Sequence, residues 1–172
     1  SIQGFTARLR AGAYADGSPN GLWYMAPETV RALFVQALRH GVQAHVHTNG
    51  DQASELALQL LADALAEVPR ADHRTVLQHA QLMDEDQLRE AARLGAGVNL
   101  FANHVWYWGD VHAERTVGPQ AAARLDPCGS AERLGVHWSM HSDDPVTPMA
   151  PLFTAWCAVN RRTRSGRVLG AD

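Results

Sequence analysis

Apolar residues recur at helical spacing in several segments of the chain. Between Pro27 and Arg39 they fall three and four positions apart and form one face of a helix, and the proline suits a first helical turn. The same spacing predicts a helix from Gln52 to Val68. Three more helices are predicted at Asp84–Leu94, Pro127–Leu134 and Pro148–Arg161.

Short apolar runs lie between these helices and predict four strands. They are Val42–His47, Thr75–Ala80, Gly97–Phe101 and Val136–His141. Strands that alternate with helices in this way are typical of right-handed βαβ units around a parallel sheet, so an α/β fold is predicted. The stretch Ala102–Gln120 is rich in aromatic residues and histidine and lacks a clear period, so it is expected to form a long functional loop.

The length of 172 residues suits one domain, residues 1–172, with a buried core. A (β/α)₈ barrel normally takes about 250 residues, and the pattern here supplies only about four βα units. The chain is therefore expected to be either a small open α/β domain or part of a barrel.

Charge and composition narrow the range of partners. The formal net charge is −3 and neither sign forms a long block, which argues against nucleic acid and against an anionic membrane. No apolar run approaches the roughly 20 residues of a membrane span. A cytoplasmic protein that acts on a small molecule is expected, with homo-oligomerisation left open. Cys128 and Cys157 show no CxxC spacing and are interpreted as core thiols.

The candidate chemistry lies at the ends of the predicted strands. His47 ends the first strand, His79 lies near the end of the second, and Asp143 follows the fourth. Functional groups of parallel α/β folds gather at these carboxyl ends. Two imidazoles and a carboxylate suit Zn²⁺, with Fe²⁺, Mn²⁺ or Co²⁺ as alternatives. A metal held in this way lowers the pKa of water and suits hydrolysis.

Each of these residues also has a purely structural interpretation. A single histidine at a strand end is commonly hydrogen-bonded within the fold, and an aspartate close to a proline is a common turn residue. His45 and His141 lie two residues before His47 and Asp143 and therefore share their side of the strand. His45 is a weaker ligand candidate, and His141 is expected to be packed or hydrogen-bonded.

Other residues leave two interpretations open. The aromatic and histidine side chains after the third strand either wall a substrate pocket or pack as part of an ordinary loop. They are His104, Trp106, Tyr107, Trp108 and His112. Asp51 is interpreted as the cap of the helix that follows it.

Three ordered motifs resemble the YtcJ-like branch of the amidohydrolase superfamily, often called the amidohydrolase 3 family. They are Val46-His47-Thr48-Asn49-Gly50-Asp51, His79-Ala80-Gln81 and Ser142-Asp143-Asp144-Pro145-Val146, which are similar to the family's HAIGD, EHAQ and SDxPV stretches. The opening Ser1-Ile2-Gln3-Gly4 resembles the segment after the family's fourth barrel strand. The resemblance therefore runs along nearly the whole chain.

The resemblance implies a partial (β/α)₈ barrel that covers strands five to eight and binds one or two divalent metals. By this resemblance His47, His79 and Asp143 are metal ligands, and Asp143 is also the catalytic proton shuttle. Members of the family mostly hydrolyse C–N bonds in amides, formamides or cyclic ureides. The family's His-x-His pair would precede Ser1, so this chain alone is expected to be incomplete and inactive.

The chain departs from the family pattern at several positions. Gln78 stands where glutamate is frequent, Thr48-Asn49 replaces a more apolar pair, and Asp144 adds a second carboxylate. These departures bear on the substrate rather than on the fold. A non-catalytic binding or scaffold module stays open as the alternative function, and the sequence upstream would decide between the two. A phosphate-binding domain has little support, because no P-loop or GxGxxG turn follows a strand.

Overall fold

The computed structural model describes residues 1–172 and contains one sheet of four strands. The strands are β1 (His45–Thr48), β2 (Val76–His79), β3 (Gly97–Leu100) and β4 (His137–Met140). All three neighbouring pairs are parallel, and the order in the sheet follows the order in the chain. The predicted parallel α/β fold is therefore confirmed, and four successive βα units are consistent with part of a barrel.

Helices precede, connect and follow the strands as the periodicity predicts. They are α1 (Pro27–His40), α2 (Asp51–Glu67), α3 (Glu85–Leu94), α6 (Cys128–Arg133) and α7 (Pro151–Asn160). Local signals set some of their ends: Gly41 closes α1 with a φ of 68°, and Asp84 begins α3 in a capping box with Gln87. None of the helices combines the length and apolarity needed to cross a lipid bilayer.

The prediction of a long loop at Ala102–Gln120 is wrong, because most of this stretch is helical. It contains α4 (Asn103–Val111), the π-helical turn η1 (His112–Thr116) and α5 (Gly118–Ala122). Side chains four positions apart hold it together: the rings of His104 and Trp108 are in tilted contact with centroids 4.5 Å apart, and Nδ1 of His112 lies 2.8 Å from Oγ1 of Thr116. Because polar side chains occupy much of the buried face, the usual apolar stripe is absent from the sequence.

The two faces of the sheet differ in chemistry. Val46, Leu77, Val98 and Trp138 belong to or pack against the main apolar core, which they share with the inner faces of the helices. The other face carries a row of polar side chains that crosses all four strands. In this row Gln78 Nε2 contacts His45 Nδ1 at 2.6 Å, Asn99 Nδ2 donates to Gln78 Oε1 at 2.8 Å, and Ser139 Oγ donates to Asn99 Oδ1 at 2.9 Å.

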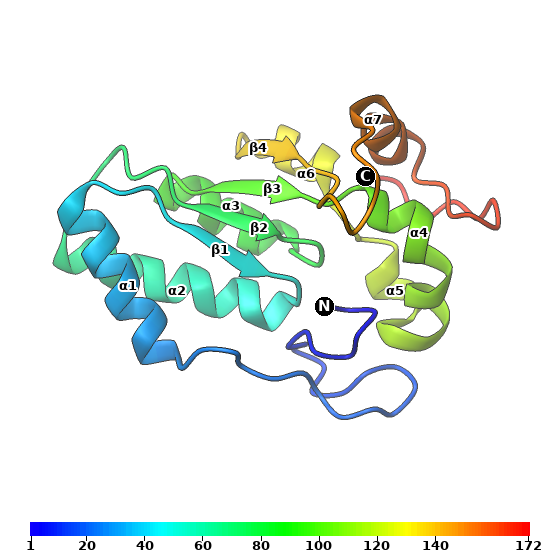
Figure 1. Ribbon diagram of the computed structural model, residues 1–172, viewed down its shortest axis with the longest axis horizontal. Helices are drawn as coiled ribbons and strands as arrows, with labels where there is room; N and C mark the ends of the chain where they lie inside the picture. Colours follow the sequence, from blue (N-terminus) through cyan, green and yellow to red (C-terminus); the bar gives the residue numbers. More distant parts are fainter.

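The strands bring one end of the sheet to the part of the molecule that carries the candidate chemistry. Figure 1 shows the four arrows pointing the same way, toward α4, α5 and the N-terminal segment. A second, smaller apolar cluster lies at this end and includes Ile2 and Tyr14 from the N-terminal segment and Val105 from α4. The carboxyl ends of the strands therefore face a packed cluster of residues from segments far apart in the sequence.

Candidate metal centre

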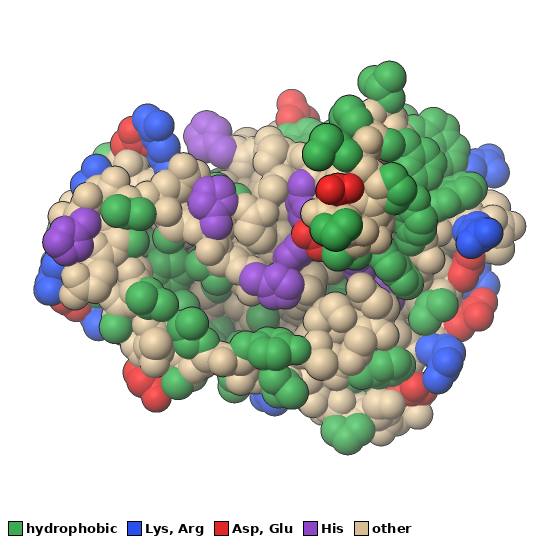
Figure 2. Space-filling model, in the orientation of Figure 1, with side chains coloured by type: hydrophobic (Ala, Val, Ile, Leu, Met, Phe, Trp, Pro, Cys, Tyr) green, Lys and Arg blue, Asp and Glu red, His purple; other side chains and the backbone are tan.

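Four side chains converge at the carboxyl ends of the strands: His47 of β1, His79 of β2, and His141 and Asp143 just after β4. Nε2 of His79 lies 2.9 Å from Nδ1 of His47, and the rings of His79 and His141 have centroids 4.9 Å apart. One ligand atom from each of His79, His141 and Asp143 lies within 4.8 Å of the other two. Figure 2 shows histidine and acidic side chains close together near the centre of the visible face.

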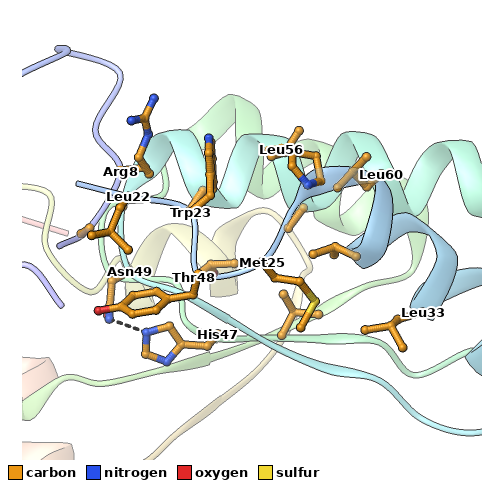
Figure 3. Close-up of a pocket in the computed structure, with 18 of the residues that line it drawn as sticks. Arg8, Leu22, Trp23, Met25, Leu33, His47, Thr48, Asn49, Leu56 and Leu60 are labelled. Atoms are coloured by element: carbon orange, nitrogen blue, oxygen red, sulfur yellow. Dashed lines mark hydrogen bonds between the residues drawn. The ribbon is translucent and has the colours of Figure 1, made fainter. Parts of the chain in front are cut away.

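Asn49 determines which ring nitrogen of His47 carries the proton. Its amide nitrogen lies 2.9 Å from Nε2 of His47, and an amide nitrogen can only donate, so Nε2 accepts (Figure 3). Burial lowers the pKa of His47, so the neutral ring carries its proton on Nδ1 and donates it to Nε2 of His79. Rotation of the Asn49 amide would reverse this arrangement and free Nδ1 as an acceptor.

His79 is the most enclosed of the four residues named above, with 7% of its surface exposed. Burial, followed by the neighbouring rings of His47 and His141, lowers its pKa to about 3, so the ring is neutral at pH 7. Its Nδ1 is buried and has no hydrogen-bond partner. The backbone at His79 and Ala80 has φ values of 70° and 49°. Such left-handed conformations are costly for residues other than glycine and concentrate at functional sites.

Asp143 lies in a turn that is tied to α4. The residue has a φ of 55°, and its carbonyl accepts a hydrogen bond from the amide of Val146 at 2.6 Å. The buried hydroxyl of Thr147 donates to the carbonyl of Ser142 and accepts from Nδ2 of Asn103 in α4. The helix that replaces the expected loop therefore helps to place the Asp143 turn, whereas Asp144, next along the chain, is exposed.

The interpretation of His141 changes in the structure. Its ring is packed, as expected, because it stacks on Phe101 with centroids 4.9 Å apart and planes 28° apart. Its Nε2, however, is buried without a hydrogen-bond partner, and the ring offers a ligand atom to the group with His79 and Asp143. The signal for this placement was its position two residues before Asp143 on the same side of the strand.

The family follows from the whole sequence rather than from these side chains alone. Residues 3–172 match the model of the Amidohydrolase family, Amidohydro_3. The chain belongs to this family. It is 27% identical over 168 residues, or 95% of its length, to the putative amidohydrolase YtcJ of Bacillus subtilis strain 168. The expected family membership is therefore confirmed.

Two solved structures share the fold of this amidohydrolase chain. One is an uncharacterized metal-dependent hydrolase from Pyrococcus furiosus, with a TM-score of 0.77 and 25% identity over 94% of this chain. The other is an uncharacterized metal-dependent hydrolase from Pyrococcus horikoshii OT3, with a TM-score of 0.77 and 24% identity over 94% of this chain. The chain spans 30% of the Bacillus protein and 31% and 32% of the horikoshii and furiosus proteins.

Two other candidate residues of this amidohydrolase chain have structural partners away from the cluster. His45 contacts Gln78 in the polar row rather than the histidine cluster, with Nε2 of Gln78 lying 2.6 Å from Nδ1 of the ring. Asp51 is the first residue of α2 and the cap is Gly50, so the predicted cap is displaced by one position. Its carboxylate instead accepts from the backbone amide of Arg10 at 2.9 Å.

Apart from the exposed Tyr107, the aromatic residues of α4 pack within the fold. The ring of Trp106 lies edge-on to Phe153 and Trp156 of α7, with centroids 5.7 Å away in both cases, and His104 and His112 are buried. None of the five residues named for this stretch lines the cleft of about 900 Å³ that follows β1. The packed interpretation of this segment therefore accounts for what the structure shows. The free thiols of Cys128 and Cys157 are buried, as expected.

A large apolar cleft lies beside the histidine cluster. It has a volume of about 900 Å³ and follows β1 between α1 and α2. Figure 3 shows Leu22 and Trp23 near its His47 end and Leu33 near the other. His45 and His47 line this cleft, but His79, His141 and Asp143 do not. The apolar cleft is therefore a neighbour of the candidate metal centre and does not contain it.

Proposed function

We propose that this chain forms part of a metal-dependent hydrolase that cleaves C–N bonds in small molecules. The observation that carries the proposal is the meeting of His47, His79 and Asp143 at the carboxyl ends of parallel strands. The resemblance to the amidohydrolase 3 family supports an amide, a formamide or a cyclic ureide as the substrate class.

The donors present fit a divalent metal, with zinc as the proposed ion. Two imidazole nitrogens and a carboxylate oxygen are the donor set that Zn²⁺ prefers, and Fe²⁺, Mn²⁺ and Co²⁺ accept the same set. Burial lowers the pKa of both His47 and His79, so both rings are neutral at pH 7, as ligands must be. Their facing nitrogens are 2.9 Å apart, close to the roughly 3 Å that separates neighbouring ligands on one ion.

Each residue has a distinct role in the proposed mechanism. His47, His79 and Asp143 would hold the metal, and Asn49 would orient the His47 ring once its amide oxygen accepts the Nε2 proton. When bound, the metal lowers the pKa of a water molecule and polarises the substrate carbonyl. The Asp143 carboxylate takes the proton of the attacking water. As the C–N bond breaks, it passes that proton to the leaving nitrogen, which balances the reaction.

Activity is proposed for the whole protein, because the family resemblance places a His-x-His pair outside this span. The test compares Asp143→Asn with Asp144→Asn in the full-length enzyme on amides, formamides and cyclic ureides. An asparagine can neither take the proton from water nor deliver it, so Asp143→Asn is expected to lower kcat by roughly two or more orders of magnitude. The exposed Asp144 is the matched control, and Asp144→Asn is expected to leave kcat nearly unchanged.

The measurement is kcat, with metal content determined on the same samples. Asp143→Asn should keep much of the metal, because the histidine ligands remain. Equal and mild effects of the two substitutions would show that Asp143 is only a turn residue, and the mechanism would then be wrong. A full-length protein that binds metal but hydrolyses none of these substrates would favour the non-catalytic alternative.

A further inference from the structure

His141 is held in place by both its backbone and its ring. Its amide donates to the carbonyl of Leu100 at 3.0 Å, which extends the pairing of β4 with β3 by one residue. Its ring stacks on Phe101, which is 1% exposed, and lies 4.9 Å from the ring of His79 by centroids. A side chain fixed in this way presents its ring atoms in one direction.

One ring nitrogen of His141 lacks a hydrogen-bond partner. Nε2 is buried and makes no hydrogen bond. Buried polar atoms of native proteins are nearly always paired, so each exception calls for an explanation. This nitrogen therefore points to a missing partner.

The buried nitrogen of His141 suits a ligand. A neutral imidazole has one ring nitrogen with a free lone pair, which is the form in which histidine binds metals. Nε2 of His141 makes no hydrogen bond within the protein, so no other group competes for it.

Geometry and chemistry agree on the identity of the partner. Ligand atoms of His79, His141 and Asp143 lie within 4.8 Å of one another, and donors on one ion are roughly 3 to 4 Å apart, so small side-chain movements suffice. A carboxylate among two imidazoles favours a cation over an anion.

We propose that His141 is a metal ligand and that His79, His141 and Asp143 form a divalent-cation site contained within this chain. The inference rests on the metal dependence of the proposed function and adds a ligand that none of the resembling motifs supplies. In the whole protein His141 then binds the metal together with His47, His79 and Asp143.

The test is a titration of the full chain with Co²⁺, followed by visible absorption, which reports the ligands around the ion. The wild-type chain is expected to bind Co²⁺. His141→Asn is expected to weaken Co²⁺ binding by roughly 10–100-fold or more, because even the loss of a residue that hydrogen-bonds to a metal ligand has an effect of that size. The control is His137→Asn, on the same strand, whose exposed ring makes no hydrogen bond, and it should bind as the wild type does.

A second measurement uses only the wild-type chain and does not depend on the folding of a variant. In a ¹⁵N-histidine-labelled sample, Zn²⁺ should shift the Nε2 resonance of His141, identified by its contact with the Phe101 ring. Unchanged Co²⁺ binding in His141→Asn together with an unshifted resonance would overturn the inference. A chain that binds no Co²⁺ would overturn it as well, but would leave the hydrolase proposal standing, because that proposal is tested by kcat on the whole protein.

Discussion

The buried pair of His104 and His112 makes the stability of this chain sensitive to acid. Nδ1 of His104 lies 3.1 Å from Nε2 of His112, the two rings stack at 5.3 Å, and Thr116 completes the row. Burial lowers the pKa of His112 to about 4. The pKa of histidine in the unfolded chain is about 6.5, so protonation between these two values favours unfolding.

The size of the effect follows from the shift in pKa. Between pH 7 and pH 5 the unfolded chain binds a proton at His112, while the folded protein, with a pKa of about 4, keeps the ring mostly neutral. From the unfolded-state pKa of about 6.5 down to pH 5 is about 1.5 pH units, and each unit contributes about 1.4 kcal/mol. The free energy of unfolding should therefore fall by about 2 kcal/mol through this residue alone. The stability is present at neutral pH and is lost as the pH falls.

The assay is urea unfolding of the wild type and His112→Asn at pH 7 and pH 5. Asparagine does not titrate, so the variant, although less stable at pH 7 because it loses packing, should lose about 2 kcal/mol less than the wild type on acidification. His137→Asn, which removes an exposed histidine, should follow the wild type. Equal losses in the wild type and His112→Asn would refute the assignment of acid sensitivity to this buried pair.

Two further predictions concern local structure. Asp84→Ala removes the capping box of α3 and should lower the free energy of unfolding, measured in urea, by about 1 kcal/mol. As the control, Asp86→Ala on the exposed face of the same helix should change it by less than about 0.5 kcal/mol. Gly50→Ala would place a Cβ 1.9 Å from the carbonyl oxygen of Arg8 and should distort the loop that carries Asn49, with loss of thermal stability. Gly12→Ala, with open space around its Cβ, should cost only the strain of a positive φ, and a melting temperature as low as that of Gly50→Ala would contradict the steric explanation.

Much of the fold was determined by the sequence itself. The helices at Pro27–His40, Asp51–Glu67 and Glu85–Leu94 follow from local apolar spacing, and capping and glycine signals predict several of their ends within a few residues. Alternation of strands with helices sets the parallel order, because right-handed connections leave few other arrangements. The positions of His47, His79 and Asp143 at strand ends follow from the same pattern.

Only the tertiary structure decided the rest. The helix at Asn103–Val111 is stabilised partly by stacked and hydrogen-bonded side chains, so the sequence shows no apolar period there. His141 was expected to have an ordinary packed role, but its unpaired nitrogen appears only when β4 lies beside β3 and the ring rests on Phe101. The left-handed backbone at His79 and Asp143 has the same origin. Contacts between segments distant in the sequence impose these conformations, and a local pattern of residues contains no record of such contacts.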